Sequence, residues 1–83
     1  MPDPAVGLAT RTEHKAELFA VLAELRQLSE VDRAALLLRV QEEMPYEEIA
    51  QTLNLPVTTV KVKVHRARLK LMRARDTFQE VRP

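Results

Sequence analysis

Apolar residues recur at helical spacing along most of the chain, and this pattern predicts four helices. The first should begin at about Arg11, because Thr10 stands at the start of a capping-box pattern. Leu18, Leu22 and Leu25 then share one face of this helix. That face is the one we expect to turn toward the core.

A second helix follows Ser29, which is a favourable N-cap residue. We expect this helix to end near Glu42 or Glu43. Its apolar residues are Val31, Ala35, Leu36, Leu38 and Val40.

A third, short helix should open at Pro45 and run through Leu53. Glu47 and Glu48 fall in its first turn, where carboxylates favour the positive end of the helix dipole. Asn54 is expected to stop the helix, since asparagine tolerates the left-handed backbone conformation.

The fourth helix is the longest and is expected from about Thr58 to Phe78. The residues on its apolar stripe are Val60, Val64, Ala67, Leu71, Ala74 and Phe78. A short helix, a tight turn and a longer basic helix together make a helix-turn-helix. Small Ala50 lets the two helices approach, Leu55 fills the space under the turn, and the outer face of the second helix is free to enter a DNA major groove.

Composition supports the same fold class. The chain has 83 residues, enough for one small domain, and its only glycine is Gly7, so the turn signals of β-hairpins are nearly absent. We therefore predict an all-α fold, a four-helix domain with a C-terminal helix-turn-helix and no winged elements. The domain is expected over residues 10–78, with a tail or linker remnant at 1–9 and a second tail at 79–83.

Composition also excludes several classes of protein. The chain has no cysteine, which excludes a disulfide framework and a thiolate metal site. The longest apolar run is Leu18 to Ala23, far short of the ~20 residues that span a bilayer. No signal peptide is evident. We expect a cytoplasmic protein without a membrane or small-molecule partner.

The net charge of +1 conceals a strong asymmetry. Residues 1–57 hold five Lys/Arg against ten Asp/Glu, a balance of −5, whereas residues 58–83 hold eight against two, a balance of +6. Between Thr58 and Arg75 there are seven bases and no acid. Such asymmetry indicates an anionic partner for the basic end, although basic tails also serve solubility.

Four blocks of sequence resemble region 4 of bacterial RNA polymerase sigma factors, most closely the extracytoplasmic-function branch. The blocks are Leu36-Leu37-Leu38-Arg39, Tyr46-Glu47-Glu48-Ile49-Ala50, Leu55-Pro56-Val57-Thr58-Thr59-Val60-Lys61 and His65-Arg66-Ala67-Arg68. The resemblance covers roughly residues 20 to 75. It implies that the last helix reads the minus-35 promoter element, that the domain docks on the β flap of RNA polymerase, and that an anti-sigma factor is a further partner.

The chain departs from the family pattern at several positions. Pro45 stands where the family usually has serine, which removes a helix cap. Val62 stands where a serine is common, and Leu69 stands where a base is common. The family also usually carries region 2, which melts the minus-10 element. We therefore expect an excised domain or a stand-alone relative.

In a docked helix-turn-helix, the first half of the second helix reaches base edges. The residues that occupy this part of the chain are Thr58, Thr59, Lys61, Val62 and His65 or Arg66. Lys61 and Arg66 are candidates for guanine, and Val62 for a thymine methyl group. Bases farther from this surface are expected to face phosphates or water; they are Lys63, Arg68, Lys70 and Arg73.

Two residues outside the last helix join this DNA-binding set, each with an alternative. Arg39 matches a family position near the DNA backbone, or it forms a surface salt bridge with a glutamate. The Tyr46 hydroxyl binds a phosphate, or the ring is half-buried packing. Val62 and Leu69 admit a further role as an exposed apolar pair that binds a partner helix, although scattered surface apolar residues are normal.

Catalysis and metal binding find no support in the sequence. His14 and His65 are the only histidines, and they fall on different predicted helices without a second ligand. We predict no enzyme, no cofactor and no metal. The predicted function is sequence-specific promoter binding in transcription initiation. The alternatives are a region-4-like interaction module held by an anti-sigma factor, or a DNA-binding domain of the response-regulator type.

Overall fold

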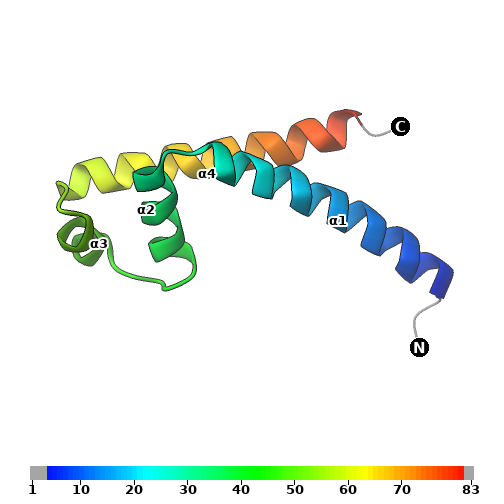
Figure 1. Cartoon of the computed structure of the whole chain (residues 1–83), viewed down its shortest axis with the longest axis horizontal. Coiled ribbons are helices and arrows are strands. Elements are labelled where there is room, and N and C mark those ends of the chain that lie inside the picture. The colour runs from blue at the N-terminus through cyan, green and yellow to red at the C-terminus, as the bar shows by residue number, and fades with distance from the viewer. Residues whose placement is uncertain (1–3, 82–83) are drawn as a thin grey trace.

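The computed structural model describes the backbone of residues 4–81 and the side chains of residues 15–77. Its elements are α1 (Pro4–Gln27), α2 (Glu30–Val40), α3 (Tyr46–Leu53) and α4 (Val57–Val81), and the described residues form no strand. The molecule is elongated, with extents of 49 × 29 × 16 Å. The all-α, four-helix prediction is confirmed (Figure 1).

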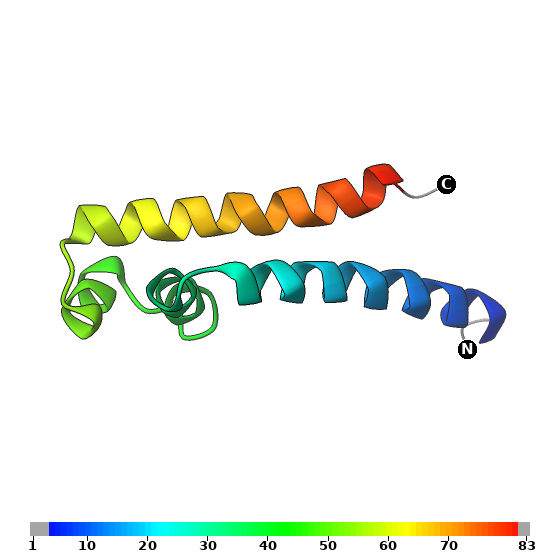
Figure 2. The same cartoon turned by 45° about the horizontal axis from the view of Figure 1, so that its top comes forward.

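The two long helices run in opposite directions and pack against each other, so that both chain ends lie at the same end of the molecule (Figure 2). Helices α2 and α3 pack against α4 at the opposite end of the molecule from the termini. Toward the chain termini, α1 and α4 diverge (Figure 1). The helix-turn-helix therefore sits at one end of a two-helix stalk.

A small aliphatic core joins α2, α3 and α4. Its buried residues are Leu28, Ala35, Leu36, Ile49, Ala50, Val60, Val64 and Ala67. Alanines in all three helices keep the backbones close, and the branched side chains fill the space between them. Of the predicted α4 stripe, Leu71 packs partly buried against this core. The side chain of Phe78 lies outside the described residues.

The first helix differs from the prediction in two respects. It begins at Pro4 rather than at Arg11, so it includes residues that the sequence assigned to a tail. Its apolar face is only partly covered, because Leu18 is 55% exposed and Leu22 is 39% exposed. The physical reason is that α1 turns a neighbouring face toward α4: Ala20, Val21 and Leu25 are half-buried, and Val21 lies with Leu71 and Met72 of α4.

The second helix begins as expected and ends slightly early. The Ser29 hydroxyl accepts a hydrogen bond from the backbone N–H of Asp32 at 3.1 Å, so the predicted N-cap is confirmed. The last helical residue is Val40, two residues before Glu42. Glu43 has a φ of 51°, a left-handed conformation that the sequence did not predict.

The turn of the helix-turn-helix consists of Asn54, Leu55 and Pro56. Asn54 adopts the left-handed conformation, with φ 56° and ψ 50°, as predicted. The N–H of Leu55 bonds to the Ala50 carbonyl at 2.9 Å and that of Asn54 bonds to the Gln51 carbonyl at 3.3 Å. This pair of bonds is a Schellman motif, which closes α3 and aims the chain into α4.

Candidate nucleic-acid interface

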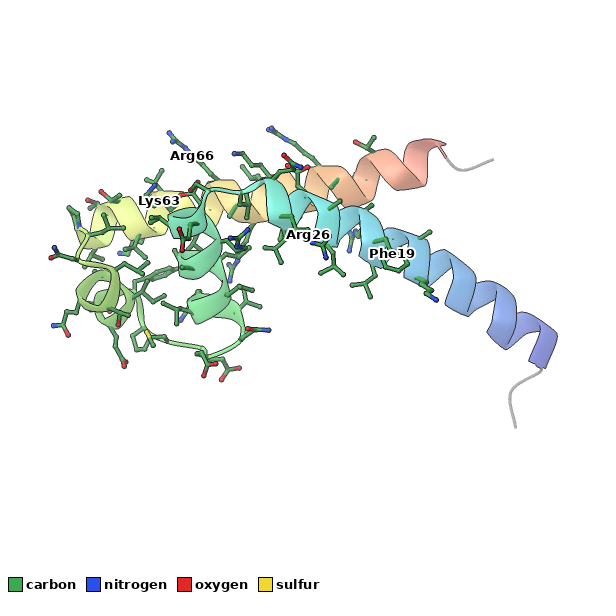
Figure 3. The ribbon with its side chains drawn as sticks, in the orientation of Figure 1. Phe19, Arg26, Lys63 and Arg66 are labelled. Carbon is green, nitrogen blue, oxygen red and sulfur yellow. The ribbon has the colours of Figure 1, made fainter. Side chains whose placement is uncertain are left out.

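Helix α4 has a buried side and an exposed side. Val60, Val64 and Ala67 bury one side against the core. The residues that lie exposed in the first half of α4 are Thr58, Lys61, Val62, His65, Arg66 and Arg68. Figure 3 shows Arg66 extending away from the ribbon. The α4 set predicted from the sequence therefore falls on the accessible side of the helix, with Thr59 and Lys63 half-buried at its edge.

Lys63 has a partner within the chain. Its Nζ donates a hydrogen bond to Oδ1 of Asp32 at 2.9 Å, with the two side chains 31% and 24% exposed. This bond, with the charge of Lys63, lowers the pKa of Asp32 below its ordinary 3.8, despite the partial burial that opposes it. Lys63 therefore has a partner in α2 as well as an exposed part, and its expected contact with phosphates or water stays a prediction.

Arg39, Tyr46 and Lys61 form a cation–π cluster that joins α2, α3 and α4. The Arg39 guanidinium carbon lies 4.7 Å from the Tyr46 ring centroid, and the Lys61 Nζ lies 5.9 Å from it. The Arg39 Nη1 also donates to the Met44 carbonyl at 3.2 Å. The salt-bridge alternative for Arg39 finds no counterpart among the described ion pairs.

Tyr46 is half-buried and packs against the core, in agreement with the packing alternative. The phosphate contact of its hydroxyl stays a prediction. The ring lies beside two cations, Arg39 and Lys61.

A shallow depression of about 250 Å³ lies on the outer surface of α4. Its lining residues are Thr58, Thr59, Val62, Lys63 and Arg66. Val62 is 46% exposed, so this part of the surface presents an aliphatic group between polar ones. All of its lining residues except Lys63 are positions expected to reach base edges.

The expected apolar pair of Val62 and Leu69 is only half present. Val62 is exposed, but Leu69 is half-buried and so offers little surface to a partner helix. A larger apolar surface lies elsewhere, in a groove of about 340 Å³ between α1, α2 and α4. The groove is lined by Leu25, Leu36, Leu37, Val40, Arg68, Leu71 and Met72.

The sequence did not predict this groove, because its lining residues come from three separate helices. Val40 and Met72, which line the groove, are each 53% exposed. The helical spacing of apolar residues does not predict that these two side chains are exposed. The sequence likewise missed the role of Asp32. An acidic residue in the first turn of a helix is already explained by the helix dipole, so nothing in the sequence indicated that Asp32 pairs with Lys63.

No metal centre is formed by the side chains of residues 15–77. His65 is exposed on α4, and His14 lies outside the described side chains. Among the described helices, none combines the length and the apolar character that a bilayer span requires.

A protein-family model described as Sigma-70, region 4 matches residues 18–71. The chain belongs to the sigma-70 region 4 family. Region 4 domains bind DNA and are not enzymes, and the matched segment contains the core, α3, the turn and α4 as far as Leu71. No curated protein and no solved structure matches this region 4 domain.

Proposed function

We propose that this region 4 domain binds the minus-35 element of promoters in the bacterial cytoplasm, as part of a sigma factor of the extracytoplasmic-function branch. The observation that carries the proposal is the two-sidedness of α4. The helix is anchored by Val60 and Val64 in the core while Val62 and Arg66 lie exposed one turn apart on its outer side. A helix held in this way can enter the major groove without unfolding any part of the domain.

Two classes of contact follow from the surroundings of each side chain. Thr58, Thr59, His65, Val62 and Arg66 belong to the outer side of α4 and are the proposed contacts to base edges. The proposed contacts to the DNA backbone are Lys61, Arg68, Arg39 and Tyr46. Lys61 is assigned to the backbone contacts because it lies near the Tyr46 ring together with Arg39. A cluster of cations is suited to binding the phosphates of the DNA backbone. Lys63 is proposed as a weaker contact to the DNA backbone, because its ammonium group already binds Asp32.

The polymerase β flap is the proposed protein partner. The apolar groove between α1, α2 and α4 supports this, because it is lined almost entirely by aliphatic side chains and includes the exposed Val40 and Met72. It is formed in part by Leu71 and Met72, beyond the turns of α4 that carry Val62 and Arg66. The proposed surfaces for DNA and polymerase therefore meet only at Arg68, which lines the edge of the groove. The family match favours this reading over a response-regulator-type domain.

An anti-sigma factor is the alternative partner for the same groove. It would act by holding the domain away from polymerase or by covering α4. A competition experiment tests whether both partners bind the groove. If they do, addition of the anti-sigma factor should displace core polymerase from the domain.

The DNA-binding proposal is tested by selecting sites from a random-sequence duplex library with the purified chain, and then measuring affinity for the enriched site. Arg66→Ala should weaken binding to that site by ~1–3 kcal/mol and relax specificity at one position. Lys61→Ala should weaken binding to all duplexes alike and reduce the slope of log affinity against log salt by about 1.

Arg75→Ala is the matched control. It removes the same charge from an exposed arginine farther along α4, with only a 4.0 Å contact to Asp76. It should change specificity at no position. If Arg66→Ala and Lys61→Ala bind as the unmodified chain does, α4 is not the reader.

A further inference from the structure

The bases at the start of α4 differ in how free they are to reach DNA bases. Lys61 lies near the ring of Tyr46, at 5.9 Å from its centroid, and Lys63 is bonded to Asp32 at 2.9 Å. The ammonium group of Lys63 keeps further N–H donors while it is ion-paired, but it must move away from the Asp32 carboxylate to reach a base edge. Arg66 is exposed, and the described side chains give it no hydrogen-bond or ion-pair partner. Of these three cations, Arg66 is the one that binds a base without breaking an existing contact.

Val62 lies beside Arg66 in the same depression. Residues four apart on a helix share a face, and Thr58, at four residues before Val62, continues that face. Val62 is 46% exposed, so its methyl groups meet whatever enters the depression. An aliphatic side chain here gives a base edge no hydrogen bond.

The major groove presents one apolar group on a base edge, the C5-methyl group of thymine. A valine side chain placed against any other base edge would cover a polar group without satisfying it. A thymine methyl group is therefore the group that Val62 tolerates best.

We propose that Val62 is a specificity-determining residue of this domain, selecting a thymine through its C5-methyl group next to a guanine read by Arg66. This inference rests on the proposed DNA binding through α4. Four residues of helix rise by about 6 Å, which corresponds to about two base-pair steps of 3.4 Å. The thymine and the guanine should thus lie within about two base pairs of each other.

The test uses the site enriched from the random duplex library. Each thymine of that site is replaced in turn by deoxyuridine, which lacks only the methyl group, and affinity is measured with the unmodified chain. One replacement, within about two base pairs of the guanine that Arg66→Ala ceases to select, should lower affinity about fourfold, the effect of one buried methyl group.

Val62→Ser is the complementary variant. Its affinity should be the same for the thymine and the deoxyuridine duplex. Serine has a helix propensity similar to that of valine, and the position is exposed, so the fold should persist. Val31→Ser is the matched control, because it makes the same chemical change at an exposed valine near the start of α2, outside both proposed binding surfaces, and should keep the fourfold preference.

The outcomes are distinct. If the chain enriches a site but no thymine responds to loss of its methyl group, or if Val62→Ser keeps the full preference, this inference is wrong while DNA binding stands. If the chain enriches no site, sequence-specific binding fails and this inference fails with it.

Discussion

Asp32 and Lys63 join two helices through a hydrogen-bonded ion pair between residues that are 31 positions apart in the sequence. Asp32 lies in the first turn of α2, and its own N–H is held by the Ser29 hydroxyl. The backbone of Asp32 is therefore held in place, which lowers the entropy that the ion pair must overcome. The pair fixes the start of α2 to the N-terminal half of α4.

The first prediction concerns the stability that this pair contributes. Asp32→Asn should lower the free energy of unfolding at neutral pH by about 1 kcal/mol, since the pair is partly exposed and an acid is also lost from the first turn of α2. Lys63→Met, which keeps the aliphatic stem, should have a similar effect. Urea denaturation followed by circular dichroism measures both. Unchanged stability in both variants would contradict a stabilising pair.

The same pair predicts how stability depends on pH. Because the pKa of Asp32 is lower in the folded protein than its ordinary 3.8, its stabilisation is fully present above pH 3.8. It is lost as the pH falls through the lowered folded-state value. The stability difference between the unmodified chain and Asp32→Asn should therefore shrink on acidification below 3.8. A difference that stayed constant from neutral pH to about pH 2 would show that Asp32 does not act through its charge.

At the scale of the element, the turn between α3 and α4 decides how the helix-turn-helix is presented. Helix α3 has no side-chain cap at Pro45, but the Pro45 carbonyl accepts the N–H groups of Glu48 and Ile49, each at 3.0 Å. Its other end is closed by the left-handed Asn54. The direction of α4 relative to α3 therefore depends more on the C-terminal end of α3 than on its N-terminal end.

The turn gives a prediction about backbone conformation. Asn54→Ala should lower the free energy of unfolding by about 1 kcal/mol, because alanine has no side chain to stabilise the left-handed conformation. Asn54→Gly is the control and should leave stability nearly unchanged, since glycine adopts this conformation freely. Thermal unfolding measures both variants. Equal stabilities for the alanine and glycine variants would mean that the turn does not require the left-handed residue.

At the scale of the whole molecule, two surfaces are available to different partners. The outer side of α4 carries Val62 and Arg66, and the groove between α1, α2 and α4 carries Val40 and Met72. A domain of this size makes few DNA contacts, so binding to polymerase would raise its effective concentration at the promoter. The proposed function needs both surfaces at once.

This separation predicts a variant that affects one partner alone. Val40→Asp places a charge in the apolar groove and should weaken binding to core RNA polymerase by about tenfold, a moderate interface effect. Gln41→Asp adds the same charge at the neighbouring exposed residue, outside the groove lining, and is the control. Both variants should bind the selected duplex as the unmodified chain does. If polymerase binding is equal in the two variants, the groove is not the docking surface.

The order of helices, the Ser29 cap, the left-handed Asn54 and the burial of Val60 and Val64 followed from the sequence alone. These features depend on neighbours within one or two turns, where spacing and side-chain chemistry decide the outcome. The exposed outer side of α4 followed from the same periodicity.

The tertiary structure decided the features that depend on distant residues. It paired Lys63 with Asp32, brought Lys61 and Arg39 to one ring, and left Leu18 of α1 uncovered. Each outcome depends on the angle and distance at which helices pack, and local periodicity specifies neither. The sequence therefore determined which side of α4 is accessible, while the packing of α2 and α3 against it determined which of its bases remain free.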